Sequence, residues 1–440
     1  RRQRQMCIRD RFNNMNGANL AGRQNKYECN FFHMIVEGCD FKESPEEMSI
    51  EHLGTFIHEY IHYLQQITTP FGLSFCHHFI KKYILYRDHI NRHDPVELPL
   101  RLDKDYSFVD YAELLLGARN GTVNYSKGRV DRVIVNKQNI ADAKRSRMAV
   151  NIGVVDDELG RTYENGFDFG YTCVIESMAH LIQSLVNPDV LVLNLPIKYR
   201  AAQMICREYC PEIAEDIKML ISLCYTALYF DNPGAAFFTM IDYANEHPGE
   251  NGIEIYKRIM REHSRKYKGE EMPAYRMMHR MIDEFIINLS ALLGHDLEYY
   301  RGVFENCKRE ASGGESKLLE IIYNGDISSK ESIYELTRFF GIPCIDSKSV
   351  EPIVPSFSRA ALLETGCLLS METLVKRFEE KEDRVICSRF DRCEQFPYEE
   401  RVTSQECRDG CQWQKTENCY FTSGLKHWGW ENKRFIERQL

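Results

Sequence analysis

Residues 56–65 read FIHEYIHYLQ, and two histidines stand four positions apart within this stretch. Apolar side chains recur around them, from Ile50 to Ile67, at the helical period of about 3.6 residues. A helix is therefore predicted here, ending at the proline of TTPFG. Residues four apart on a helix project from one face, so His58 and His62 can present their imidazoles to a single point.

The pairing of His58 and His62 predicts a metal site. Two neutral ring nitrogens at about 2 Å from one ion supply half of a tetrahedral zinc site. Glu59 lies where a carboxylate can take a proton from a water molecule that attacks a carbonyl. The segment HEYIH resembles the His-Glu-x-x-His motif of the zincin superfamily of zinc peptidases. This resemblance implies a catalytic Zn²⁺, hydrolysis of peptide bonds and Glu59 as general base.

A third protein ligand is needed, and the nearby sequence does not provide it. The metzincin group would need a glycine three positions and a histidine six positions after His62, where this chain has Gln65 and Thr68. A thermolysin-like spacing would need a glutamate about twenty residues further on, and residues 79–96 contain none. The third ligand is therefore expected from further along the chain.

The segment VIESMAHLIQ, residues 174–183, carries the best candidates, Glu176 and His180. At about 100° per residue, both side chains flank the apolar stripe of a helix, as the two histidines of the first helix do. Two helices packed through these stripes would point all four groups into one cleft. Glu176 is thus the predicted third ligand, which resembles the gluzincin group, and Glu113 and Glu164 remain alternatives.

The role of His180 stays open. It lies one turn after Glu176, where gluzincins often have an acidic residue that supports a ligand. A histidine there could orient a metal ligand, bind the metal itself or stabilise an oxyanion as a catalytic residue.

The remaining patterns predict an α+β fold that is predominantly α-helical. A strand is expected at 30–38, and a small sheet or hairpin at 132–136 and 148–155, because these runs are rich in β-branched and aromatic residues. Helical periodicity returns at 169–186 and dominates after residue 195. Three domains are predicted: a zincin-like catalytic domain with a small sheet and the active-site helix (12–190), a helical domain (191–380) and a Cys-rich segment (381–440).

The Cys-rich segment contains five cysteines, with His427 nearby. Four thiolates can hold a structural zinc, which would stabilise a segment too short to build its own core. No Cys-x-x-Cys pair is present, so unpaired thiols or a disulfide are alternatives. The predicted structural metal ligands are Cys393, Cys407, Cys411 and Cys419, and the fifth thiol is Cys387.

Composition limits the partners. A net charge of −9 argues against nucleic-acid binding by bulk electrostatics. The longest apolar runs, 190–197 and 285–294, are too short for a membrane span. Eleven of the 16 cysteines are scattered singly, mostly among apolar residues, which favours a reducing, cytoplasmic setting. The first eleven residues resemble a translated sequencing adapter and are excluded from fold prediction, so secretion is not strictly ruled out.

Two rival interpretations accompany the peptidase. One is a regulatory zinc-binding protein that keeps the motif but cleaves nothing, or cleaves one dedicated target. The other is a helical interaction protein in which the motif is accidental. The expected partner of the peptidase is a peptide or protein substrate, and the sequence does not indicate an oligomeric state.

Overall fold

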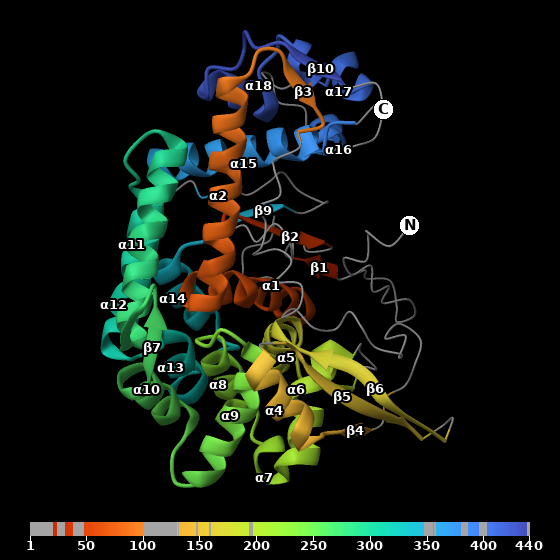
Figure 1. Cartoon of the computed structure of the whole chain (residues 1–440), viewed down its shortest axis with the longest axis vertical. Helices are drawn as coiled ribbons and strands as arrows, with labels where there is room; N and C mark the ends of the chain where they lie inside the picture. Colours follow the sequence, from red (N-terminus) through yellow and green to blue (C-terminus); the bar gives the residue numbers. More distant parts are fainter. Residues whose placement is uncertain are drawn as a thin grey trace.

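Helices make up most of the described chain, together with four small sheets (Figure 1). The computed structural model describes residues 21–23, 31–37, 48–100, 130, 132–146, 148–157, 160–192, 197–346, 355, 358–379, 386–395 and 403–437. The predicted α+β class with a helical majority is confirmed for these residues. The first eleven residues lie outside them.

The helices at 50–68 and 171–186 and most of those between residues 197 and 379 fall where the 3.6-residue period predicted them, whereas the helix at 137–146 and the short helices after residue 386 were not predicted. Among the described helices, none is both long enough and apolar enough to cross a membrane. The helices are α1 (Ile50–Thr68), α2 (Pro70–Arg92), α4 (Lys137–Ser146), α5 (Tyr171–Val186), η1 (Pro188–Val192), α6 (Ile197–Tyr209), α7 (Pro211–Ala214), α8 (Ile217–Ala227), α9 (Pro233–Glu246), α10 (Gly252–Glu262), α11 (Ala274–Leu293), α12 (Tyr299–Gly313), α13 (Lys317–Asn324), α14 (Lys330–Phe340), α15 (Arg359–Glu379), α16 (Phe390–Gln395), α17 (Gln405–Asp409), η2 (Gln412–Gln414) and α18 (Tyr420–His427).

Helix α1 lies in the middle of the molecule and is buried along most of its length (Figure 1). Ser49 caps its start by accepting a hydrogen bond from the His52 amide. Thr69 separates α1 from α2, whose first residue is a proline. The Thr69 hydroxyl accepts a hydrogen bond from the Gly72 amide. A proline cannot continue the hydrogen-bonding pattern of α1 but fits the first turn of α2. The sequence signals therefore place this helix–helix corner correctly.

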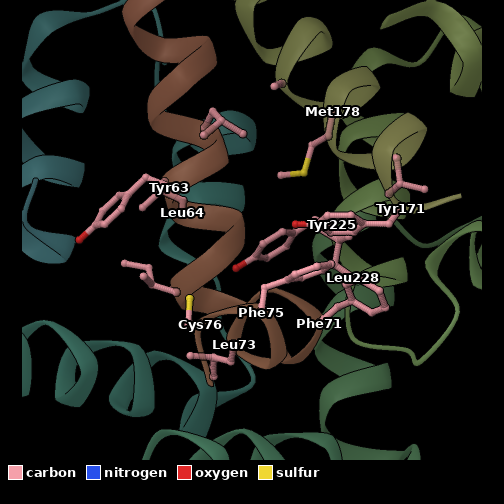
Figure 2. Packing of buried hydrophobic residues seen from close by; sticks show 14 of the residues in the cluster. Tyr63, Leu64, Phe71, Leu73, Phe75, Cys76, Tyr171, Met178, Tyr225 and Leu228 are labelled. Atoms are coloured by element: carbon pink, nitrogen blue, oxygen red, sulfur yellow. The ribbon is translucent and has the colours of Figure 1, made fainter. Parts of the chain in front are cut away.

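The two faces of α1 contact different parts of the chain. On one face, the hydroxyls of Tyr60 and Tyr63 donate to the carbonyls of Gly341 (2.8 Å) and Phe340 (2.7 Å) at the end of α14. The other face packs against α5. In Figure 2, Tyr63 points away from Met178, which belongs to α5. Because α1 lies between these elements, its polar side chains face protein on each side.

The corner between α1 and α2 lies in the aromatic part of the core (Figure 2). The Phe71 and Tyr171 rings lie 4.7 Å apart, which joins α2 to the start of α5. From α8, the Tyr225 hydroxyl donates to the Thr68 hydroxyl at 2.8 Å, so a buried polar group at the end of α1 is paired. These contacts fix the position of α1 relative to α5.

The sheets are small and join distant segments. In the first, β2 (His33–Glu37) pairs antiparallel with β1 (Ala21–Arg23) and parallel with β9 (Cys344–Asp346). In the second, β5 (Val150–Asp156) pairs antiparallel with β4 (Arg132–Ile134) and β6 (Arg161–Phe169). The others are the parallel pair β3 (Val96–Leu98) with β10 (Phe435–Glu437) and the hairpin β7 (Ser264–Tyr267) with β8 (Glu270–Pro273). The strands expected at 30–38, 132–136 and 148–155 correspond to β2, β4 and β5.

Strand β6 was not predicted, because its Asn-Gly pair is typical of a turn. Here Gly166 lies inside the strand, beside a register shift between Ile152 and Val154. A Cβ on Gly166 would lie 2.7 Å from Val154 Cγ1, so the glycine permits close packing of β5 and β6. Turn chemistry and close strand packing require the same residue, and only the tertiary contact distinguishes them.

Helices from both sides of residue 190 pack together, since α5 contacts α6 and α8. Strand β3 near residue 97 likewise pairs with β10 near residue 436. The division into 12–190, 191–380 and 381–440 stays a prediction.

Gly72 permits the close approach of α2 to the end of α1. A Cβ at this position would lie 2.2 Å from the Gln65 carbonyl oxygen and 2.4 Å from the Gln66 Cα, which are backbone atoms that cannot rotate away. We expect Gly72→Ala to lower the free energy of unfolding by about 1–3 kcal/mol, measured by urea denaturation.

Gly366→Ala in α15 is the matched control, because its Cβ would meet no atom within 4 Å. There the better helix propensity of alanine should raise stability by about 0.5–1 kcal/mol. Equal effects of the two substitutions would contradict the packing argument.

Candidate metal centre

His58 and His62 lie one turn apart on the face of α1 that packs against α5. Their rings meet edge to face with centroids 4.9 Å apart. Each residue is only 7% exposed, so neither imidazole is a solvated surface group. The motif from His58 to His62 is helical throughout, so the shared face that the 3.6-residue period predicted is present.

Glu176 of α5 completes the group. Its Oε2 lies 3.4 Å from His58 Nε2 and 3.5 Å from His62 Nε2. Within the described part of the chain, these three residues form the group whose ligand atoms all lie within 4.8 Å of one another, and such a group can hold a metal ion. The structure therefore brings the three predicted residues together, while their role as metal ligands stays a prediction.

The alternatives to Glu176 differ in position. Glu164 is exposed on β6 and does not belong to this group. Glu113 lies outside the described residues. Glu176 is thus the described candidate that faces both histidines.

Lys198 of α6 also contacts the centre, and the sequence analysis missed it. Its Nζ lies 3.1 Å from Glu176 Oε1, so one carboxylate oxygen is engaged by an ammonium group while the other faces the histidines. A signal was present in the sequence, since Lys198 shares one helical face with Ala201, Ala202 and Ile205, all buried. A lysine on a buried face needs an anionic partner.

Gln65 stands at the position where a metzincin would have a glycine. Its side chain supports His62. Its side-chain amide nitrogen donates to the Ile175 carbonyl at 3.1 Å, so its Oε1 must be the atom that accepts from His62 Nδ1 at 2.8 Å. This assignment puts the proton of the neutral imidazole on Nδ1. The lone pair of His62 Nε2 is then directed at the group with Glu176.

Charges in the centre favour an ionised carboxylate and a neutral His58. Burial would raise the pKa of Glu176, but Lys198 and the two histidines outweigh it and hold that pKa well below its usual range. Burial lowers the pKa of His58, although Glu176 opposes this. Burial also acts to lower the pKa of His62, but hydrogen bonding to Glu176 and the charges of Glu176 and Glu59 raise it overall.

Glu59 and His180 lie beside the group without belonging to it. Both are buried, each with 3% exposure, and the charge of Glu59 acts on His62. Burial, followed by the nearby His58 and Arg200, lowers the pKa of His180 to about 4, so it is neutral near pH 7. Among the described residues, no hydrogen-bond partner faces His180 Nδ1.

A cavity of about 970 Å³ lies on the other face of α1, between α1, α12 and α14. Its lining includes Leu53 and Phe56 of α1, Val303 of α12 and Phe339 of α14. Leu53 and Phe56 lie about 120° to 180° round α1 from the two histidines. The cavity therefore does not open onto the face of α1 that carries His58 and His62.

The tail cysteines take a different arrangement from the predicted one. All described cysteines are free thiols. Cys393, Cys407 and Cys419 line one small pocket near α16 and α18, and Cys387 lines it with them. Cys411 is not among the residues that line this pocket. Four-thiol binding through Cys411 stays a prediction, and the fourth thiol in the shared pocket is Cys387.

No protein-family model, curated protein or solved structure matches this chain. The properties of the centre follow from its donor atoms. Two imidazoles and one carboxylate are a set used by catalytic zinc, and imidazole also binds iron, copper and nickel. The group could hold a metal ion, and its donor atoms are of the kind that divalent transition metals use.

Gln65 provides a test of the hydrogen bond that orients His62. Gln65→Leu removes the acceptor for Nδ1–H, and loss of such a partner typically weakens metal affinity by about 10- to 100-fold. We expect a drop of this size in zinc affinity, measured by competition with a chromophoric chelator.

Gln66→Leu is the matched control, since this neighbouring buried glutamine projects about 100° further round α1. It should leave the affinity unchanged. Equal losses in both variants would mean that the effect is general destabilisation.

Proposed function

We propose that this chain is a zinc-dependent peptidase with a zincin-like catalytic domain in residues 12–190. The observation that carries the proposal is the convergence of His58, His62 and Glu176 from two helices, with Glu59 beside the first histidine. The donor atoms fit the ion: a carboxylate with a lowered pKa faces the Nε2 atoms of two imidazoles.

His58, His62 and Glu176 would hold the zinc. Bound there, zinc would act as a Lewis acid and lower the pKa of a coordinated water towards neutrality. The chain's own contribution begins with orientation: Gln65 fixes the tautomer of His62, and Lys198 occupies Glu176 Oε1. Both contacts leave the facing atoms available to the ion.

Glu59 would act as the general base. Its place directly after His58 keeps its carboxylate beside the group, and its burial limits competing solvation. It would accept a proton from the attacking water and pass that proton to the leaving amine. The substrate is a peptide or protein, whose carbonyl carbon the water attacks.

His180 would serve as a hydrogen-bond donor to the developing oxyanion. Its position outside the three-residue ligand group favours this role over metal ligation. Its neutral state near pH 7 supplies an N–H donor. Tyr199 lies between it and His58, with ring centroids 5.9 Å and 5.7 Å away.

The second candidate is a regulatory zinc-binding protein. The specific observation in its favour is burial: His58, His62, Glu59, Glu176 and His180 are each at most 7% exposed. A buried centre can stabilise the packing of α1 on α5 without admitting a substrate. Scattered free thiols among apolar neighbours support a cytoplasmic setting for either function.

Zinc content tests whether the centre binds metal. The His58→Ala, His62→Ala double variant should lose one zinc per chain relative to unaltered protein purified without chelator, because two of three ligands are gone. Elemental mass spectrometry gives the count. The control is His89→Ala, His93→Ala, which removes another pair four residues apart, at the end of α2. If both double variants retain as much zinc as the unaltered chain, His58 and His62 do not bind zinc and the proposed metal centre is wrong.

Glu59→Gln tests catalysis separately from metal binding. It keeps the size of the side chain but cannot accept a proton, so cleavage should fall by about 10²- to 10⁴-fold while zinc content is unchanged. Cleavage is followed by mass spectrometry on a proteome-derived peptide library with zinc-loaded protein. If the unaltered chain holds zinc and cleaves none of the library, the regulatory function is favoured.

A further inference from the structure

Four cysteines from four different parts of the C-terminal segment surround one enclosed space. Cys387 precedes α16, Cys393 lies within α16, Cys407 lies in α17 and Cys419 is the N-cap of α18. All four line a pocket of about 20 Å³. A water molecule needs roughly 10 to 15 Å³ by this measure, so the pocket has the size of one small ion.

Backbone hydrogen bonds hold the chain at Cys387, Cys393 and Cys407. The Cys387 amide donates to the Cys407 carbonyl at 3.0 Å, which ties the residues before α16 to α17. The Cys393 amide donates to the Arg389 carbonyl at 2.9 Å. These bonds fix the backbone from which the sulfurs project, and rotation of the side chains moves the sulfurs relative to it.

Hydrogen-bond donors and a cation face the sulfurs. The Thr422 amide donates to Cys419 Sγ at 3.5 Å, while the Thr422 hydroxyl donates to the Glu417 carbonyl at 2.8 Å. Lys415, which is 8% exposed, places its Nζ 3.5 Å from Cys407 Sγ. A buried ammonium group is costly beside a neutral thiol and favourable beside a thiolate. The Lys415 contact suits a negatively charged sulfur at Cys407, while burial raises the pKa of the Cys387 and Cys393 thiols.

The other buried cation of the pocket has carboxylate partners. Arg389 lies 3.4 Å from Asp346 of β9 and 3.4 Å from Glu372 of α15. These pairs connect the segment to the rest of the fold and satisfy the guanidinium charge. Lys415 contacts one of the sulfurs, that of Cys407.

A metal ion would cross-link the short helices of the segment, whose Phe421, Leu425 and Phe435 pack into the main core. Its helices α16, α17 and α18 have 6, 5 and 8 residues, lengths that do not form stable helices alone. The described cysteines are free thiols, so no disulfide joins them. A structural zinc stabilises such a segment by fixing distant residues around one ion.

We propose that Cys387, Cys393, Cys407 and Cys419 form a structural zinc site. Each thiol releases one proton as its sulfur binds the ion, giving a site with two net negative charges beside Lys415. Among the described residues, only the ligand atoms of His58, His62 and Glu176 all lie within 4.8 Å of one another. The four sulfurs must therefore move closer together to bind one ion. The proposal is independent of the peptidase function.

Metal content tests the site in the full chain purified without chelator. We expect the Cys393→Ser, Cys407→Ser double variant to lose one zinc per chain. Cys411→Ser is the matched control, because Cys411 lies in the same segment but outside the pocket lining, and it should lose none. Unchanged zinc in the double variant, or an equal loss in Cys411→Ser, overturns the proposal.

Thiol labelling of the His58→Ala, His62→Ala chain gives a second measurement with all cysteines intact and the other centre disabled. Iodoacetamide modification is read by mass spectrometry before and after chelator treatment. We expect the four pocket cysteines to be protected until the chelator is added, and Cys411 to react equally in both states. Protection that does not respond to the chelator, or a disulfide between two pocket cysteines, overturns the zinc site.

Discussion

The ionised carboxylate of Glu176, buried between α1 and α5, is the constraint on which this centre depends. A buried negative charge is costly unless its environment compensates it. Here two imidazoles face one oxygen and the ammonium of Lys198 faces the other. Helix α6 is therefore as necessary to the centre as the two helices that carry the predicted ligands.

Helix α1 has two chemically different faces, as an amphipathic helix does, but neither face is turned to solvent. Both of its faces are buried, but they differ in chemistry: Tyr60 and Tyr63 donate to carbonyls at the end of α14, while the histidines face α5. The apolar cavity lies on the first face and the charged centre on the second. One helix thus separates an apolar space from a polar group that could hold a metal ion.

The C-terminal segment follows the same physical logic with different ligands. Its short helices cannot form a core of their own, and they are attached to β9 and α15 through the Arg389 ion pairs and to β3 through β10. Polar donors are directed at sulfur there, whereas in the first centre the Gln65 Oε1 accepts a hydrogen bond from the His62 imidazole. In both places the supporting contacts come from residues that have no motif.

The sequence by itself determined what is local. The helical period fixes which residues share a face, so α1, α5 and the pairs His58–His62 and Glu176–His180 were predictable. The tertiary structure decided what depends on distant contacts: that Lys198 and Gln65 support the ligands, that an Asn-Gly pair lies inside β6, and that Cys387 rather than Cys411 joins the other three thiols. The physical reason is that periodicity encodes the direction of a side chain along its own element. The partner it meets is set by how the elements pack.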